Sequence, residues 1–398
     1  MTVPPLRLKK DQDRRLRAGH LWVYSNEVDT DKTPFDQFEA GQVVAVENAQ
    51  GKWQGLAYVN PNSLICARLV TRQRDLAFDG SLFVHRIKVA LSLRERLYPA
   101  PYYRLIFGEG DALPGVVVDR YGDHLVVQIT TAGMEAQREA LVAALVKVLR
   151  PAGILLRNDS PSREPEGLSR YIELAHGDLP DQLQIEEGGC RFDVSPTEGQ
   201  KTGWFYDQAA NREAFTALVN GNRVLDVCSY VGAWSVRAAK AGARAVMAVD
   251  ASAQALAQLS SNTVLNSCEE KIETIQGDAF QALRELRAER ERFDIIVLDP
   301  PAFIKRRKDM KQGTLAYRRL NEAALGLLER DGLLISASCS FHLSGEGLLK
   351  TIQQAARHSD RNVQVLRRGY QGPDHPVHPA IPETGYLKAM TMRVLPTQ

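Results

Sequence analysis

The 398-residue sequence lacks paired cysteines. Its five cysteines are scattered, odd in number and never in a Cys-x-x-Cys pair: Cys66, Cys190, Cys228, Cys268 and Cys339. A disulfide framework and a zinc knuckle are therefore not expected. His375 and His378 have no third ligand near them in the sequence, so we predict no metal site. Unpaired cysteines are typical of a reducing compartment, where thiols stay available for chemistry.

The sequence also lacks long apolar runs and a strong charge of either sign. No run approaches the roughly 20 residues that cross a bilayer, and the first 20 residues lack the apolar core of a signal peptide. We therefore expect no membrane partner. A net charge of +2 does not by itself indicate a nucleic-acid binder. The 44% hydrophobic and 25% charged residues are typical of a soluble globular protein with two or three domains.

Residues 1–75 are predicted to form a small β-rich module, with short strands at 42–47, 53–58 and 65–69. A basic segment precedes aromatic residues in AGHLWVYSNEV, a composition that suits phosphate contact and base stacking, although an ordinary solvated helix is the alternative. With GQVVAVENAQGKWQGLAYVNPNS, this stretch resembles a PUA domain, an RNA-binding fold. The resemblance implies that Arg14, Arg15, Arg17 and His20 face RNA.

Residues 76–195 are predicted to form a central α+β domain. Helical spacing marks 82–97 and 134–149, and the pair Gly188-Gly189 predicts a hairpin between strands 184–187 and 190–194. Further strands are expected at 104–107, 115–119, 124–129 and 153–157. No residue here suggests catalysis, so we interpret this domain as a spacer that widens a substrate groove.

Residues 196–398 change to an alternation of strands and helices, which predicts a doubly wound parallel sheet of the α/β class. The apolar run 293–298 is a buried strand stopped by Pro300 and Pro301. Asp299 therefore lies at the carboxyl end of a central strand, where open α/β sheets bind ligands.

Three acidic residues end successive strands of this half. Asp226 precedes a loop that leads to Gly232, Asp250 follows 24 residues later at the spacing suited to ribose hydroxyls, and Asp278 could accept a bond from an adenine amine. A single strand-end aspartate is usually a helix cap, but three in register favour a nucleoside site.

The loop after Asp226 is not GxGxxG and offers no pyrophosphate cradle of that kind. That favours a nucleoside cofactor without phosphates, such as S-adenosylmethionine. The whole half resembles the Rossmann-like methyltransferases, which implies cofactor contacts at Cys228, Ser229, Gly232 and Asp299 as well. For Cys228, plain packing is the alternative.

A glycine- and aromatic-containing stretch, EGQKTGWFYDQ, lies at the start of this half, upstream of its first predicted strand. It is a mobile flap or, alternatively, an interdomain linker. It resembles the KTGFFxDQ signature of one RNA methyltransferase family, in which the segment closes over the cofactor. The resemblance implies cofactor contacts at Gln200, Thr202, Phe205 and Asp207.

Cys339 follows an apolar run and is expected at the same sheet edge as Asp299, one strand over. Carbon 5 of a pyrimidine is too electron-poor to attack a methyl sulfonium until a thiolate adds to carbon 6, and a nearby carboxylic acid helps by sharing a proton. The base must be flipped out of its stack. RNA 5-methylcytosine enzymes resemble this arrangement, but many have a second Cys after Asp-Pro, where this chain has Pro301-Ala302. That difference keeps N-methylation open.

A basic run follows the Asp-Pro-Pro turn, and we predict that Lys305, Arg306 and Arg307 bind substrate phosphates rather than being only solvated. In its full order the chain resembles the large-subunit ribosomal RNA methyltransferase I family. This resemblance implies formation of 5-methylcytosine in 23S ribosomal RNA, in the cytoplasm. An N-methyltransferase and a non-catalytic RNA-binding assembly factor are the alternatives. The sequence does not fix the oligomeric state and is compatible with a homodimer.

Overall fold

The computed structural model describes residues 3–200 and 202–397. Backbone contacts divide the chain into two compact units. The first contains Met1–Leu183, Ser195–Trp204 and Pro373–Thr384, and the second contains Gln184–Val194, Phe205–Gly372 and Gly385–Gln398. The finer division into three domains, with boundaries at 75 and 195, stays a prediction.

The first unit begins with a five-stranded sheet in the order β1-β3-β4-β5-β2. Its strands and its one-turn helix are β1 (Pro5–Arg7), α1 (Arg14–Arg17), β2 (Trp22–Tyr24), β3 (Val43–Glu47), β4 (Trp53–Val59) and β5 (Ile65–Thr71). Alternate residues of β3 (Val44 and Val46) and of β4 (Ala57 and Val59) face one core, which also includes Leu6. The three strands predicted here are confirmed as β3, β4 and β5.

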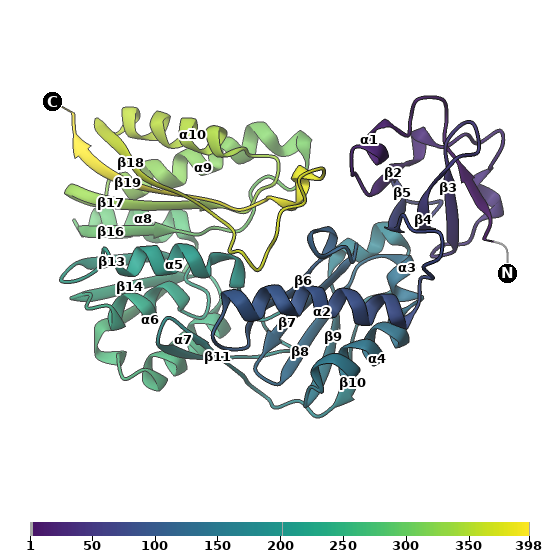
Figure 1. Ribbon diagram of the computed structural model, residues 1–398. Coiled ribbons are helices and arrows are strands. Elements are labelled where there is room, and N and C mark those ends of the chain that lie inside the picture. Colours follow the sequence, from purple (N-terminus) through teal and green to yellow (C-terminus); the bar gives the residue numbers. More distant parts are fainter. Residues whose placement is uncertain (1–2, 201, 398) are drawn as a thin grey trace. The chain divides into compact units, whose positions relative to one another are not determined.

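A second sheet of the first unit has the order β10-β9-β8-β7-β6. Its elements are α2 (Gly80–Leu97), β6 (Tyr102–Phe107), β7 (Val116–Tyr121), β8 (His124–Ile129), α3 (Ala132–Glu135), α4 (Arg138–Leu149), β9 (Gly153–Asn158) and β10 (Tyr171–Gly177). The helix predicted at 134–149 is interrupted between α3 and α4. Helices α2 and α4 lie beside the sheet (Figure 1) and share one buried core with it.

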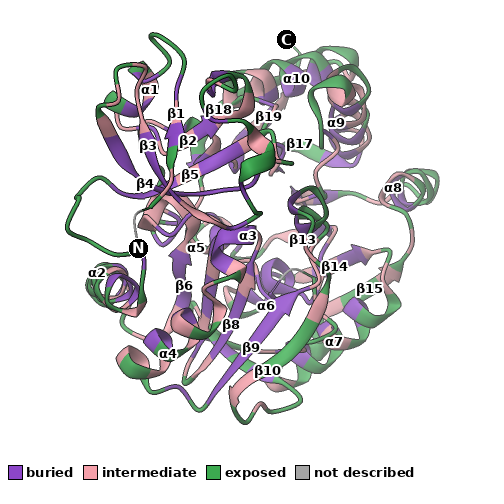
Figure 2. Cartoon of the chain, turned by 90° about the vertical axis from the view of Figure 1, so that its right-hand side faces the viewer, coloured by how far each residue is buried: buried purple, intermediate pink, exposed green. Residues whose placement is uncertain are grey.

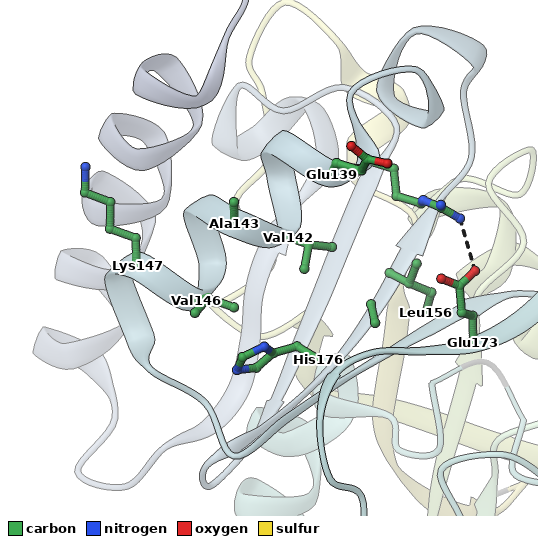
Figure 3. A pocket seen from close by; sticks show the side chains of 10 residues that line it. Glu139, Val142, Ala143, Val146, Lys147, Leu156, Glu173 and His176 are labelled. Atoms are coloured by element: carbon green, nitrogen blue, oxygen red, sulfur yellow. Dashed lines mark hydrogen bonds and ion pairs between the residues drawn. The ribbon is translucent and has the colours of Figure 1, made fainter.

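The edge strand β10 is largely exposed, whereas its neighbour β9 is buried (Figure 2). A groove lies between α4 and this edge of the sheet (Figure 3), and its described lining contains none of the predicted site residues. Arg138 of α4 and Glu173 of β10 form an ion pair of 3.1 Å across it.

The second unit contains a seven-stranded sheet in the order β15-β14-β13-β16-β17-β19-β18. Its strands are β13 (Arg223–Val227), β14 (Ala245–Asp250), β15 (Ile272–Gln276), β16 (Phe293–Leu298), β17 (Leu328–Ser338), β18 (Arg361–Tyr370) and β19 (Lys388–Pro396). The predicted doubly wound sheet is confirmed. It is not wholly parallel, because β19 runs antiparallel to both of its neighbours.

Helices cover both faces of this sheet (Figure 1). They are α5 (Ala209–Thr216), α6 (Ala233–Lys240), α7 (Ala253–Leu265), α8 (Ala279–Ala288), α9 (Met310–Leu325) and α10 (Gly345–His358). Side chains of β14 alternate between the faces: Val249 packs in the core shared with α8, α9 and α10, and Ala248 packs against α7. Within the described part of the chain, no helix combines the length and the apolar character needed to cross a membrane.

The predicted hairpin is confirmed as β11 (Leu183–Glu187) and β12 (Cys190–Val194). Its turn residues Gly188 and Gly189 have φ of +58° and +72°, the left-handed pair that a tight two-residue turn requires. Glu187 accepts bonds from Arg212 and Arg237, which ties the hairpin to α5 and α6. Arg212 also donates to the carbonyl of Phe205 at 2.8 Å.

Candidate active site

The candidate site lies at the carboxyl ends of the parallel strands of the second unit. Strand β16 pairs with β13 on one side and with β17 on the other. Asp299 follows β16 directly, and Cys339 follows β17 directly. The two residues therefore leave the same sheet edge from adjacent strands, as the sequence predicts.

The loop after β13 has an unusual backbone. Cys228, Tyr230 and Gly232 have φ of +66°, +52° and +89°, and the first two are not glycine. The N–H groups of Cys228 and Ser229 both donate to the carbonyl of Val249, at 2.8 and 3.0 Å. A Cβ on Gly232 would lie 2.7 Å from Leu259. Strained backbone held by neighbouring groups is typical of ligand sites.

Asp226 lies one residue inside the end of β13 and is fully buried. Its carboxylate accepts a bond from the Ser235 hydroxyl at 2.6 Å, and burial raises its pKa to about 7. Its Oδ1 atom and the buried hydroxyl of Ser229 have no hydrogen-bond partner among the described residues. Unpaired buried polar atoms are rare and suggest a ligand or water.

The other two strand-end acids organise backbone. Asp250 ends β14 and accepts bonds from the N–H groups of Tyr230 (2.8 Å) and Ser252 (2.9 Å). Asp278 follows β15 by two residues, is exposed and caps α8 through Oδ1, which accepts from Phe280 and Gln281. Its second oxygen takes part in neither cap bond.

Asp299 is held by two side chains that the sequence did not single out. Its Oδ1 accepts from the Gln208 amide at 2.9 Å, and its Oδ2 accepts from the Trp234 indole at 3.1 Å. Burial raises the pKa of Asp299, while the bond from Trp234 opposes that rise. Gln208 is the last residue of EGQKTGWFYDQ, and Trp234 lies two residues after Gly232. Their positions in the sequence, close to predicted site residues, could have indicated both.

The turn that carries Cys339 is fixed by the two serines that flank it. Ser338 and Ser340 are buried, and Cys339 is half-buried. The Ser340 hydroxyl accepts from the N–H of Ile304 at 3.1 Å and bonds with the Tyr317 hydroxyl at 2.9 Å. The sequence motif placed Cys339 correctly at this turn but did not indicate its neighbours.

The predicted flap spans both units, and its Lys201 lies outside the described residues. In the first unit, Gln200 is exposed, and the buried Thr202 donates from its hydroxyl to Asp119. In the second unit, Phe205 packs its ring against Tyr230 with centroids 5.4 Å apart. The structure thus brings one member of the flap to the loop after β13.

Asp207 is buried in the second unit. Its carboxylate accepts a bond from the Tyr386 hydroxyl, and its backbone carbonyl accepts from Gly372 at 3.0 Å. These bonds join the flap to the segment that leads into β19. The cofactor contacts predicted for Gln200, Thr202, Phe205 and Asp207 stay predictions.

The predicted RNA contacts of the first module differ in exposure. Arg14 and Arg17 have side chains 72% and 63% exposed, which suits contact with a partner. Arg15 pairs with Glu27 at 2.6 Å. His20 is buried, and burial lowers its pKa, so it is neutral near pH 7 and supports the module's own structure. RNA contact by these four residues stays a prediction.

In the second unit, Lys305, Arg306 and Arg307 are all exposed. Arg306 pairs with Asp309 at 3.3 Å, an exposed contact that contributes little to stability. Among the described residues, no group of three or more His, Cys, Asp or Glu side chains is arranged to hold a metal ion.

Comparisons with known proteins agree with this architecture. Residues 6–72 match the family described as PUA-like domain, and residues 196–334 match the family described as conserved hypothetical protein 95. The fold is similar to a crystal structure described as a methyltransferase complexed with SAH, with TM-score 0.85 and 22% identity. It is also similar to a protein from Streptococcus mutans described as SAM-dependent methyltransferase, with TM-score 0.83 and 22% identity. Both alignments cover 98% of this chain and 100% of the other.

Sequence similarity is closer to a curated relative from Shewanella denitrificans, the ribosomal RNA large subunit methyltransferase I of that organism. The two chains are 36% identical over 394 residues, which cover 98% of this chain and 99% of the relative. At that identity over nearly the full length, the chain belongs to the ribosomal RNA large subunit methyltransferase I family.

Proposed function

We propose that this protein transfers a methyl group from S-adenosylmethionine to carbon 5 of a cytosine in 23S ribosomal RNA, through a covalent adduct with Cys339. The observation that carries the proposal is that Asp299 and Cys339 leave adjacent strands at the edge that also holds the loop after β13. Family membership supports a ribosomal RNA methyltransferase that acts in the cytoplasm.

The residues at this edge fit a nucleoside cofactor. Two buried polar atoms, Asp226 Oδ1 and the Ser229 hydroxyl, have no partner among the described residues. A Cβ on Gly277 would meet no heavy atom within 4 Å, so the backbone beside Asp278 faces open space. We assign Asp250 to the ribose hydroxyls because it ends β14 and lies beside the loop after β13, whose Tyr230 N–H donates to it. S-adenosylmethionine supplies an electrophilic methyl group when it is bound.

The chemistry that we assign to Cys339 begins with its thiolate. The sulfur forms a bond to carbon 6 of the flipped cytosine while ring nitrogen 3 gains a proton, which makes carbon 5 nucleophilic. Carbon 5 then takes the methyl group, with S-adenosylhomocysteine as the leaving group. A base then removes the proton from carbon 5, and the sulfur–carbon bond breaks to return the thiolate.

The role that we assign to Asp299 follows from its environment. Burial raises its pKa, so more of the carboxyl stays protonated near neutral pH than for an exposed aspartate. Gln208 and Trp234 both donate to it and fix its orientation. A carboxyl held in this way can share a proton with ring nitrogen 3 as carbon 6 is attacked.

We propose one RNA-binding region in each of the two units. One is the exposed segment from Lys305 to Arg307 beside the Asp-Pro-Pro turn. The other is the N-terminal module, in which Arg14 and Arg17 are exposed, Arg15 is half-buried and His20 is buried. Phosphate contacts of this kind position a substrate without reading its sequence. We also retain the three-domain division at 75 and 195, with residues 76–195 as the spacer.

The deciding experiment compares wild type with Cys339→Ala. Each protein is incubated with radiolabelled S-adenosylmethionine and undermethylated large-subunit ribosomal RNA, and the labelled nucleosides are separated. We expect label in 5-methylcytosine from the wild type only, with similar affinity of both proteins for S-adenosylhomocysteine. Equal label from the variant, or label in an N-methylated base, would overturn the thiol mechanism. A wild type that does not bind the cofactor would instead indicate a non-catalytic assembly factor.

A further inference from the structure

A buried lysine lies beside the Cys339 turn. Lys388 begins β19 and pairs in register with Ser338, the last residue of β17. Only 6% of Lys388 is exposed. Lysine is almost never buried without a paired charge, because removing an ammonium group from water is costly. Such a position calls for an explanation.

The amine of Lys388 is held by two neutral carbonyl groups. Its Nζ donates to the carbonyl of Ser340 at 2.6 Å and to the carbonyl of Tyr386 at 2.7 Å. Within the described residues it forms no ion pair with a carboxylate. Two of the three ammonium protons are therefore engaged, and the positive charge is not neutralised by either partner.

Cys339 lies between two serines that both contact Lys388. Ser338 pairs with Lys388 through the backbone, and the carbonyl of Ser340 accepts a bond from the Lys388 amine. Burial lowers the pKa of Lys388 to about 8, and the negative charge of the Cys339 thiolate raises it. An ordinary thiol has a pKa of about 8.5, so the two groups exchange a proton readily in this pH range.

The other titratable groups around this turn already have partners. From α9, Tyr317 bonds to the Ser340 hydroxyl, and burial raises its pKa. The Tyr386 hydroxyl donates to Asp207. At the end of β16, Asp299 is held by Gln208 and Trp234.

Near the first residues of α10, Glu346 pairs with Arg368 of β18. The side chain of Lys388 itself lies 3.7 Å from where a Cβ on Gly345 would be. The acidic groups packed around the turn are thus engaged elsewhere, which leaves the thiolate as the anion that suits the Lys388 ammonium.

We propose that Lys388 is a positioning residue that keeps Cys339 as a thiolate. The neutral amine takes the thiol proton, so that one S–H bond breaks, one N–H bond forms, and an ammonium–thiolate pair results. The carbonyls of Ser340 and Tyr386 fix the amine for this exchange. This inference rests on the proposed role of Cys339 as nucleophile, and it adds the group that prepares the nucleophile.

The test measures how fast iodoacetamide alkylates Cys339 between pH 5.5 and 10, with the Cys339 peptide quantified by mass spectrometry and no RNA present. In Lys388→Met, we expect the midpoint of the pH profile to rise by about one unit and the rate at pH 7 to fall about tenfold. Lys388→Arg keeps the charge and should keep most of the wild-type rate at pH 7. The matched control is Lys350→Met, which removes an exposed lysine of α10 and should leave the profile unchanged.

Thermal unfolding and S-adenosylhomocysteine binding check that each variant is folded. If Lys388→Met does not fold, Lys388→Gln replaces it, because its amide can still donate to carbonyl groups without a charge. A Cys339 profile in the neutral variants that coincides with wild type would overturn the inference, even if Cys339→Ala loses all methylation. Full methylation by Cys339→Ala would instead overturn the proposed function, whatever the alkylation profiles show.

Discussion

Two half-buried cysteines stand at the same edge of one sheet, and their surroundings have opposite charge. Cys228 begins the loop after β13, and Cys339 begins the turn after β17. Burial raises the pKa of the Cys228 thiol, and the nearby carboxylates, Asp250 foremost, raise it further. Cys339 instead lies between Ser338, which pairs with Lys388, and Ser340, whose carbonyl accepts a bond from the Lys388 amine.

If Cys339 is the nucleophile, as we propose, position at the sheet edge alone does not make a thiol nucleophilic. A thiolate forms where a cation stabilises it and is suppressed where carboxylates surround it. The acids that suppress ionisation of Cys228 are those we assign to cofactor binding, so one set of charges serves two purposes. Strand β16, with Asp299 at its end, separates the two regions.

The largest expected effect contrasts the two cysteines directly. We expect Cys339→Ala to lower the rate of methylation by roughly 1,000-fold or more, because the nucleophile is lost. Cys228→Ala should keep most of the activity, since a thiol whose pKa is raised stays protonated and cannot serve as the nucleophile. Rates of label transfer from S-adenosylmethionine to undermethylated ribosomal RNA measure both. Equal losses in the two variants would show that position, and not charge, determines the role.

Asp299 lies between the two regions and tests whether the acid there takes part in the chemistry. Asp299→Asn keeps the size of the side chain and its acceptor for Trp234 but cannot give or take a proton. We expect the turnover rate at saturating cofactor to fall about 100-fold. Asp331→Asn, in an exposed ion pair with Arg393, is the control. An unchanged turnover rate in Asp299→Asn would remove this carboxyl from the mechanism.

Asp226 tests how much the acidic region beside Cys228 lowers the stability of the fold. Its folded pKa of about 7 exceeds the unfolded value of about 3.9, so the folded state binds more protons between these values. Stability therefore falls as pH rises through this window and is constant above it. We expect Asp226→Asn to stabilise the fold by about 2 kcal/mol more at pH 8 than at pH 5.

Urea unfolding at the two pH values measures this difference, with Glu273→Gln on the exposed face of β15 as the control. The same stabilisation by Asp226→Asn at both pH values would mean that the carboxyl does not titrate between them. The acidic region would then impose no charge penalty on the fold.

The sequence predicted much of this edge because its strands carry a local signal. The apolar run 293–298 and the following prolines located Asp299, and the run before Ser338 located Cys339. What it did not predict depends on pairing across long chain separations. Strands β18 and β19 went unpredicted: β18 is a largely exposed edge strand without a continuous apolar run. Lys388 was missed with them, because the role that we propose for it depends on its pairing with Ser338, 50 residues away in the chain.

The residues around Asp299 were missed for a similar reason. Gln208 and Trp234 reach it from different segments, the first just before α5 and the second in the first turn of α6. Periodicity gives the face of a helix but not the atom that a side chain contacts. In the basic segment near the N-terminus, the sequence did not indicate that the helix is a single turn or that Arg15 pairs with Glu27.

The smallest expected effect separates the two roles that we assign to the acids beside Cys228, namely cofactor binding and suppression of thiol ionisation. Asp250→Asn removes the charge that, after burial, most opposes ionisation of the Cys228 thiol, and it weakens the acceptor that we propose for ribose hydroxyls. We expect affinity for S-adenosylhomocysteine to fall about tenfold in calorimetric titration, as for loss of one hydrogen bond to a charged group. Alkylation of Cys228 at pH 8 should rise in the same variant, while that of Cys339 should not change. Glu273→Gln should change neither quantity. Weaker binding without a change at Cys228 would show that burial alone keeps this thiol protonated, and the contrast between the two cysteines would then rest on Lys388 rather than on the acids.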